Sequence, residues 1–297
     1  MRRLVGYLVI LAVLFIGMTF LMNQNLNISS ENNTGKLKII TTIFPLAHFA
    51  QAVGGDQVDV ASVVAPGVEP HDFEPNPKDV AKILDADLFI RTGAGIDAWS
   101  EKVDRKESVV VATSAVEPIT VGEEIDPHFW LDPLRVEKLV LQIADGLSVI
   151  DPQNKDIYKK NAEAYNRKLQ ELNKEFTDSL KQCKKSELIT SHAAFAYLAD
   201  RYSLSNLAIV EDPEEDPSPR RILEIVDLIK NRNISFIFAD PFESENASRV
   251  IAQESGAVVL PLQSFEGLTS DQQDNGATYL SIMENNLSSL VKGLECQ

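Results

Sequence analysis

The sequence has little positive charge relative to its length. Its 297 residues include 28 lysines and arginines against 44 aspartates and glutamates, which gives a formal net charge of −16. Because Arg2 and Arg3 lie in an N-terminal leader, the rest of the chain carries −18 (−16 minus the leader's +2). A protein that binds nucleic acid needs a basic surface, so this composition argues against that class. An acidic surface does gather cations.

Cysteines and catalytic motifs are scarce as well. The two cysteines, Cys183 and Cys296, allow either one disulfide in an oxidising compartment or two free, buried thiols. The sequence contains neither the H-E-x-x-H motif of zinc proteases nor the G-x-S-x-G turn of serine hydrolases. It also lacks short-period repeats. We therefore expect a binding protein with no catalytic residues, and a zinc hydrolase is the less favoured alternative.

The N-terminus carries the longest apolar run of the chain. Leu4 to Met22 is a stretch of nineteen residues without a charge, preceded by Arg2 and Arg3. As a helix it would approach the ~30 Å thickness of a hydrocarbon core. Neither an A-x-A cleavage site nor a cysteine for lipid attachment follows. Residues 1–24 are thus an uncleaved signal anchor or a signal peptide, and we favour the anchor. Arg2 and Arg3 would keep the N-terminus in the cytoplasm, so we expect residues 25–36 to be a polar tether and the body to lie outside the cell membrane.

From Leu37 onwards, apolar β-branched runs alternate with helical patterns. Typical strand patterns are "VDVASVV" (58–64) and "ISFIFAD" (234–240), and "VEKLVLQIADGLSVI" (136–150) is an amphipathic helix. Strands that alternate with helices indicate parallel sheets whose faces are covered. The sequence therefore predicts an α/β fold.

One segment differs from this alternation. Residues 152–185 contain no glycine and no proline after the first position, and their apolar residues recur every three or four positions. That spacing predicts one continuous amphipathic helix of roughly 50 Å at 1.5 Å per residue. Such a helix is longer than one small lobe. We expect it to join two lobes of mostly parallel sheet with flanking helices, an N-terminal lobe at 37–151 and a C-terminal lobe at 186–297.

The chain has only four histidines, and three of them occupy similar positions. His71 and His192 follow predicted strands, and His128 comes just before a predicted helix. Ligands of parallel α/β sheets collect beyond the carboxyl ends of the strands. Neutral imidazole is the commonest protein ligand of Zn²⁺. We therefore predict a metal site formed by these three side chains, whereas His48 lies on an apolar helical face and is expected to be structural.

The surroundings of His128 support this prediction. In "DPHFWLDP" (126–133), Pro127 restricts the backbone that presents the imidazole. Asp126 and Asp132 flank the histidine, and either carboxylate could accept the second N–H of the ring and so fix its tautomer. Trp130 would help to exclude water from the site.

Six further observations concern short segments that occur in a fixed order along the chain. They are "TTIFPLAHFAQAVGGD", "VAPGVEPHDFEPNPKDV", "DPHFWLDP", "ITSHAAFAYLADRY", "IFADP" and "TYLSIMENNL". Together these segments resemble the metal-binding subunits of bacterial and archaeal ABC importers for zinc, manganese or iron. The resemblance runs from about Leu37 to the C-terminus. It implies two α/β lobes joined by a long rigid helix, with the metal between them and His71, His128 and His192 as ligands.

The fourth donor is where the sequence departs from that family. Many members carry an aspartate after the last strand, but Gln263 stands there in this chain, and glutamine is a poor zinc ligand. We expect water or Glu69 as the fourth donor, and the resemblance implies a supporting role for Asp240. Manganese-selective members often have a carboxylate at the third position, so His192 favours Zn²⁺.

The resemblance implies a receptor that captures Zn²⁺ and delivers it to an ABC permease in the membrane. Alternatives are the same fold binding Mn²⁺ or Fe²⁺, or a surface adhesin. We expect a monomer that is extracytoplasmic, whether anchored through its N-terminal segment or secreted.

Overall fold

The computed structural model describes residues 35–105, 107–121, 124–213 and 215–297. The chain divides into two units, Met1–Lys36 and Leu37–Gln297, and the fold described below is that of the second unit. The predicted anchor or signal peptide lies outside the described residues. Within the described residues, no helix is both long and apolar enough to span a bilayer.

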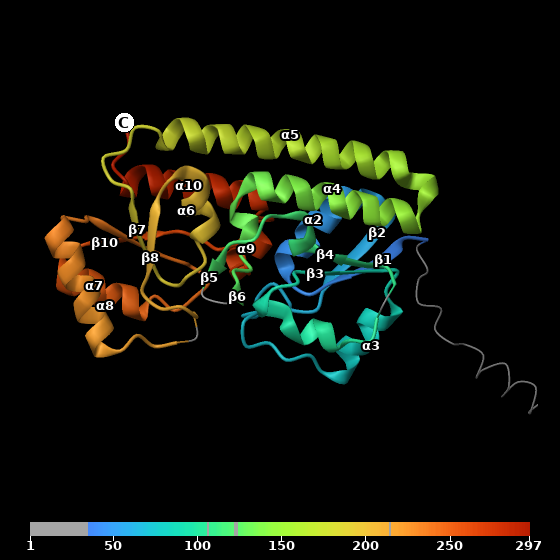
Figure 1. The fold of residues 1–297 in the computed structure, drawn as a ribbon, viewed down its shortest axis with the longest axis horizontal. Coiled ribbons are helices and arrows are strands. Elements are labelled where there is room, and N and C mark those ends of the chain that lie inside the picture. The colour runs from blue at the N-terminus through green and yellow to red at the C-terminus, as the bar shows by residue number, and fades with distance from the viewer. Residues whose placement is uncertain (1–34, 106, 122–123, 214) are drawn as a thin grey trace, which may run out of the picture. The chain divides into compact units, whose positions relative to one another are not determined.

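The N-terminal lobe is built on a parallel sheet with the strand order β2-β1-β3-β4 (Figure 1). Its strands alternate along the chain with helices, as the sequence pattern predicted. The strands are β1 (Leu37–Thr41), β2 (Val58–Ser62), β3 (Leu88–Arg91) and β4 (Val109–Val111).

The helices of this lobe are α2 (Phe44–Gly54), α3 (Pro77–Asp85) and α4 (Pro133–Ile150). Both α3 and α4 start with proline directly after a capping side chain, where the missing N–H costs nothing. Asp132 caps α4 by accepting the N–H of Leu134. A short antiparallel hairpin that the sequence analysis did not predict, β5 (Thr120–Val121) and β6 (Glu124–Ile125), precedes α4.

The C-terminal lobe has a second parallel sheet, with the order β10-β9-β7-β8. A separate apolar cluster, which includes Ile189, Ile229 and Ile237, fills the space between this sheet and two of its helices. The strands are β7 (Glu187–Thr190), β8 (Ser205–Ala208), β9 (Phe236–Ala239) and β10 (Val258–Pro261). The helices are α6 (Ala196–Tyr202), α7 (Pro219–Arg232), α8 (Asn246–Ser255), α9 (Ser270–Asp274) and α10 (Tyr279–Gly293).

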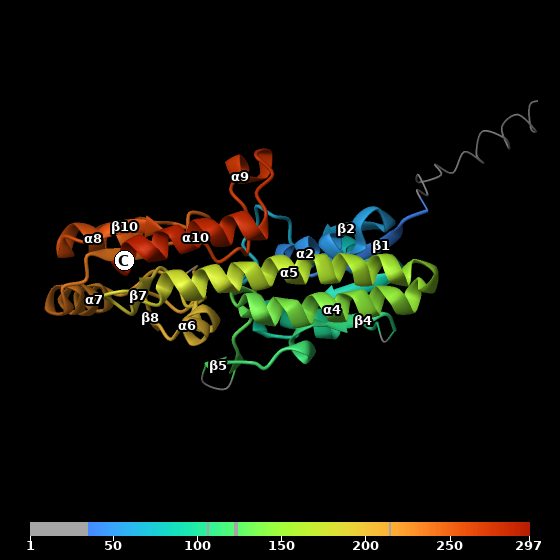
Figure 2. The same cartoon turned by 90° about the horizontal axis from the view of Figure 1, so that it is seen from above.

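Helix α5 (Lys155–Leu180) joins the lobes. It runs along α4 and α2 of the first lobe and along α10 and α6 of the second (Figures 1 and 2). One continuous apolar core extends beneath it through both lobes. The predicted fold class, two parallel-sheet lobes joined by one long helix, is confirmed. The helix is shorter than the predicted 152–185, since Pro152–Asn154 forms a separate 3-10 turn, and its 26 residues span about 39 Å.

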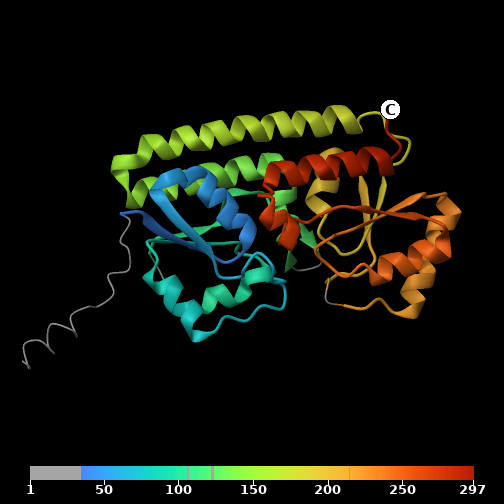
Figure 3. The ribbon, with the colours of Figure 1, turned by 180° about the vertical axis from the view of Figure 1, so that it is seen from behind.

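A disulfide between Cys183 and Cys296 fastens the chain just after α5 to the C-terminus. Backbone hydrogen bonds flank it, from Lys185 to Leu294 and from Gln297 to Gln182. Of the two alternatives that the sequence left open, the structure shows the disulfide. The view from behind shows α10 lying beneath the C-terminal half of α5, with the C-terminus near the end of α5 (Figure 3).

Candidate metal centre

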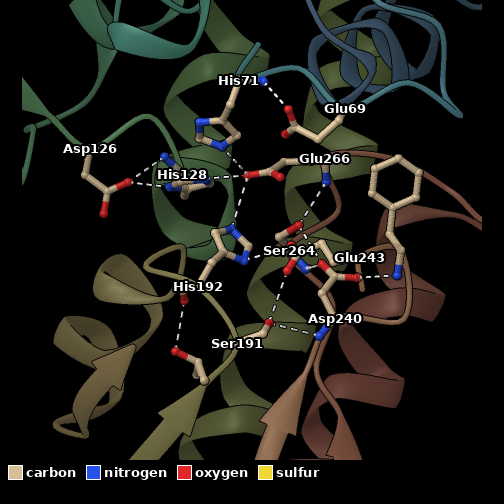
Figure 4. Close-up of polar contacts among 12 residues, drawn as sticks. Glu69, His71, Asp126, His128, Ser191, His192, Asp240, Glu243, Ser264 and Glu266 are labelled. Atoms are coloured by element: carbon tan, nitrogen blue, oxygen red, sulfur yellow. Dashed lines mark hydrogen bonds and ion pairs between the residues drawn. The ribbon is translucent and has the colours of Figure 1, made fainter. Parts of the chain in front are cut away.

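Four side chains from four separate segments meet where the two lobes face each other (Figure 4). His71 lies in the loop after β2, His128 directly before α4 and its preceding 3-10 turn, His192 two residues after β7, and Glu266 in the loop after β10. Among the residues that the structure describes, these four form the group whose ligand atoms all lie within 4.8 Å of one another. The structure therefore brings together the three histidines that the sequence singled out.

Two of the distances from Glu266 to the ring nitrogens fit the spacing of donors around a tetrahedral ion. Glu266 Oε1 lies 3.4 Å from His71 Nε2 and 3.7 Å from His192 Nε2, and it pairs directly with His128 Nε2. With Zn–N bonds of ~2.0–2.1 Å, the ligand atoms of a tetrahedral zinc site are about 3.3 Å apart. A small adjustment of the His128 ring would open the group around one ion.

Burial and unsatisfied polar atoms also point to a cation. His192 and Glu266 are 0% and 2% exposed, and His128 is 4% exposed. Within the described residues, Nε2 of His128 and Nε2 of His192 have no hydrogen-bond partner of good geometry. Buried polar atoms are normally hydrogen-bonded, so unsatisfied ring nitrogens aimed at one carboxylate indicate a place for an ion.

The electrostatics of the group favour positive charge on its histidines. Burial by itself lowers the pKa of His128, but the charges of Glu266 and Asp126 outweigh burial and raise this pKa to about 9. Burial likewise lowers the pKa of His192, and the neighbouring carboxylates of Glu243 and Glu266 raise it well above the ordinary value. Burial raises the pKa of Glu266, yet the three histidines hold it well below its usual range. The site thus stabilises positive charge beside one buried carboxylate.

Asp126 orients the ring of His128. Its Oδ1 accepts the backbone N–H of His128 at 2.9 Å and lies 2.7 Å from Nδ1, which leaves Nε2 facing Glu266. Asp132, predicted as the alternative partner of this ring, does not contact it. Its carboxylate instead caps α4 and binds Arg135 and Arg201, because the helix that begins at position 133 turns it away from the imidazole.

Glu243 lies beside Nδ1 of His192, as Asp126 lies beside Nδ1 of His128. No pattern in the sequence indicated this position of Glu243. Its Oε1 lies 2.8 Å from His192 Nδ1, and its Oε2 accepts a hydrogen bond from Ser191 at 3.2 Å. The side chain of Glu243 is only 7% exposed. A carboxylate behind a ligating histidine fixes the tautomer and raises the basicity of the ring.

The segment that carries Glu266 is held in an unusual conformation. Asp240 Oδ2 accepts hydrogen bonds from the N–H of Ser264 at 2.6 Å and from its hydroxyl at 2.7 Å. Phe265 is fully buried and has a φ of +66°, a strained value for a residue with a side chain. A Cβ on Gly267 would come within 2.7 Å of Pro66 O, so only glycine fits there. These constraints aim Glu266 inward.

Glu69, predicted as one candidate for the fourth donor, is not in the group. Its Oε2 accepts the backbone N–H of His71 at 2.8 Å, so it shapes the loop that presents this histidine. Burial raises the pKa of Glu69 to about 7, against the opposing charge of His71. The carboxylate beside the histidines is Glu266, three residues beyond Gln263. Glu266 is the only acidic residue between Pro261 and Ser270, and this feature of the sequence could have identified it as a candidate ligand.

A cavity of about 340 Å³ adjoins the centre. Among the described residues, four carboxylates line it, and two of these reach the metal-centre histidines, since Glu69 binds the backbone of His71 and Glu243 contacts the His192 ring. The negative potential of such a lining favours the approach of cations. The four acidic lining residues are Glu69, Glu215, Asp216 and Glu243.

Two parallel-sheet lobes, a connecting helix and a buried group of three histidines and one glutamate define a two-lobe α/β metal-binding protein. A family model described as ZnuA, zinc-uptake complex component A, periplasmic, matches residues 39–293. The chain belongs to this family, which confirms the resemblance found in the sequence.

Curated relatives agree with this assignment. The chain is 36% identical over 277 residues to the zinc-binding lipoprotein AdcA of Streptococcus pneumoniae strain R6, an alignment that covers 86% of this chain. It covers 55% of AdcA, so the chain spans about half the length of that relative. The high-affinity zinc uptake system protein ZnuA of Bacillus subtilis is 32% identical over 308 residues, with 97% of each chain covered.

A solved structure shows the same fold. The Zn(II)-bound ZnuA-like domain of Streptococcus pneumoniae AdcA superposes with a TM-score of 0.80 and 37% identity. The match covers 88% of this chain and 100% of that domain.

Proposed function

We propose that the protein captures Zn²⁺ outside the cytoplasm and delivers it to an ABC permease for import. The observation that carries this proposal is the buried convergence of His71, His128, His192 and Glu266, whose ligand atoms lie within 4.8 Å of one another. Three imidazole nitrogens and one carboxylate oxygen are a donor set that suits Zn²⁺. The names of the relatives, a zinc-binding lipoprotein and a zinc uptake protein, support the same metal.

Competition between metals tests this function. We expect the purified protein to contain zinc, and added Mn²⁺ to displace Zn²⁺ only at large excess. Three nitrogen donors favour zinc, which also lies far above manganese in the Irving–Williams order. The measurement is metal analysis followed by a competition titration with a chelator of known affinity. Tighter binding of Mn²⁺ than of Zn²⁺ would refute the assignment of the metal.

Zinc binding is expected to release protons and to strengthen as the pH rises from 6.5 to 9. The pKa of His128 in the metal-free protein is about 9, and that of His192 is also raised, so below these values Zn²⁺ must displace protons from its own ligands. Above pH 9 the competition from the proton of His128 ends, so the affinity should rise less steeply with pH. Calorimetric titrations at pH 7, in buffers with different ionisation enthalpies, should report at least one released proton. Constant affinity from pH 6.5 to 9 would contradict the expectation.

The proposal assigns no catalysis to the site. Catalytic zinc sites keep one coordination position for water or substrate, whereas closed sites take four protein donors. In this site four protein atoms would hold the ion, and each is on a buried or half-buried side chain. The zinc-loaded protein should therefore show no activity in esterase and peptidase assays above that of a matched zinc-free sample.

We also propose a role for each part of the chain. Residues 1–24 act as a signal anchor or signal peptide, 25–36 as a tether, 37–151 and 186–297 as the lobes, and 152–185 as the connection. The protein acts as a monomer beside its permease. Fractionation of cells that express the full chain, with N-terminal sequencing of the mature protein, separates a retained anchor from a cleaved peptide.

A further inference from the structure

The segment 126–132 belongs to the N-terminal lobe by sequence, but side chains of the C-terminal lobe hold it. The hydroxyl of Tyr197 donates to Asp126 O at 2.9 Å. Arg201 donates two hydrogen bonds to the carboxylate of Asp132, at 2.9 and 2.7 Å. Both of these side chains come from α6. The segment is therefore fixed against the opposite lobe at both ends.

Trp130, in the middle of this segment, connects two of the metal-centre residues. Its Nε1–H donates to Ser264 O at 2.8 Å, and its own carbonyl oxygen accepts from the Tyr279 hydroxyl at 2.7 Å. The indole is fully buried and packs edge-on against the His128 ring, with centroids 5.5 Å apart. Trp130 stands two residues after His128, and Ser264 stands two residues before Glu266. The Trp130–Ser264 hydrogen bond therefore links the segment that carries His128 to the segment of the other lobe that carries Glu266.

Trp130 differs in this respect from the carboxylates around the site. Asp126 orients a ring on its own segment, and Asp240 holds Ser264 from within the same lobe. In the described residues, two polar side-chain contacts join segment 126–132 to segment 262–268. One is the His128–Glu266 pair, and the other is the hydrogen bond from the indole N–H to Ser264 O. Its loss would let these two segments move apart while each keeps its local support.

We propose that Trp130 is a positioning residue that fixes the separation of His128 and Glu266 and thereby makes the site selective for Zn²⁺ over Mn²⁺. Zinc accepts four donors at short distances, whereas manganese prefers six donors, most of them oxygen. A restrained His128–Glu266 pair would oppose the rearrangement from four donors to six that Mn²⁺ requires. This inference rests on the proposed zinc-binding function.

The test is Trp130→Phe, which keeps a buried aromatic ring and removes the N–H. We expect the affinity for Zn²⁺ to fall about 10- to 100-fold, the range seen when outer partners of zinc ligands are removed. The affinity for Mn²⁺ should change little, so the Zn²⁺-to-Mn²⁺ ratio of affinities should fall by a similar factor. Co²⁺ bound in place of Zn²⁺ should also lose visible absorption, which is strong in four-coordinate sites and weak in six-coordinate ones.

Tyr158→Phe is the matched control. This buried aromatic side chain also makes one hydrogen bond, from its hydroxyl to Asp151 at 2.6 Å, but at the start of α5. It should leave the metal affinities and the Co²⁺ spectrum unchanged even where thermal stability falls. An equal loss of Zn²⁺ and Mn²⁺ affinity in Trp130→Phe, with an unaltered Co²⁺ spectrum, would mean a merely structural role and overturn the inference.

A second variant covers the case in which Trp130→Phe does not fold. Tyr279→Phe removes the hydrogen bond that holds the backbone of Trp130 and should shift the ratio of affinities in the same direction. An unchanged ratio in Tyr279→Phe would then overturn the inference. Failure of the wild-type protein to bind Zn²⁺ would refute the proposed function. Tight wild-type binding with unchanged selectivity in the variants would refute only the role of Trp130.

Discussion

Replacing Glu266 with glutamine is expected to weaken Zn²⁺ binding by about 100- to 4,000-fold. The carboxylate is 2% exposed and faces Nε2 of His71, His128 and His192. Removing one partner of a buried charged group typically costs about 3–5 kcal/mol, and each 1.4 kcal/mol is a factor of ten in affinity. The amide is nearly the same size, so the loss would reflect charge and donor strength. Competition titration of the purified variant measures it.

Glu69→Gln is the matched control for this experiment. Glu69 accepts the N–H of His71 but lies outside the group of candidate ligands, and an amide oxygen can accept the same bond. The control should retain Zn²⁺ affinity to within about tenfold. If Glu69→Gln proved as damaging as Glu266→Gln, or if Glu266→Gln bound Zn²⁺ normally, then Glu266 would not be the fourth ligand.

Replacing both Cys183 and Cys296 with alanine is expected to lower the free energy of unfolding by about 4–5 kcal/mol. The bridge closes a loop between residues 113 positions apart. In the chain-entropy model, a closed loop of roughly 100 residues contributes about 4.7 kcal/mol by restricting the unfolded chain. Denaturation in guanidinium chloride, with and without the bridge, measures the difference. A loss below about 1 kcal/mol would show that strain or residual structure cancels this effect.

Two controls show whether the loss of stability comes from the disulfide itself. Wild-type protein treated with a reductant should approach the stability of the double variant, whereas the double variant should not respond to reductant. The affinity for Zn²⁺ under native conditions should stay the same in all samples, because the bridge fastens the end of α5 to the C-terminus and contacts no residue of the metal centre.

Helices and strands were predictable where periodicity is strong. Residues 155–180 bury Tyr158, Leu169 and Phe176 on one face of a helix, and the spacing of these residues is visible in the sequence. The ends of the helix were not predictable, because caps and tertiary contacts decide where a helix begins and ends. Proline at 152 begins a 3-10 turn, and the chain leaves the helix before the disulfide at Cys183.

The start of the final helix, α10, was likewise not predictable from the sequence. The segment 274–294 has the apolar pattern of one helix, but α10 begins only at Tyr279, after a turn with φ of +65° at Gly276. Thr278 then caps α10 with its own side chain. A glycine and a threonine within an apolar pattern carry this information only when the turn geometry is known.

By itself, the sequence determined the chemistry and the order of the parts: an acidic α/β chain, one long amphipathic helix, and three histidines placed in loops at strand or helix ends. Only the tertiary structure decided which carboxylate joins those histidines, which acids orient their rings, and that Trp130 reaches across to the other lobe. The reason is distance along the chain. His71 and Glu266 are 195 residues apart, and no local pattern encodes a contact of that range, which arises only when two separately folded sheets are docked beneath one helix.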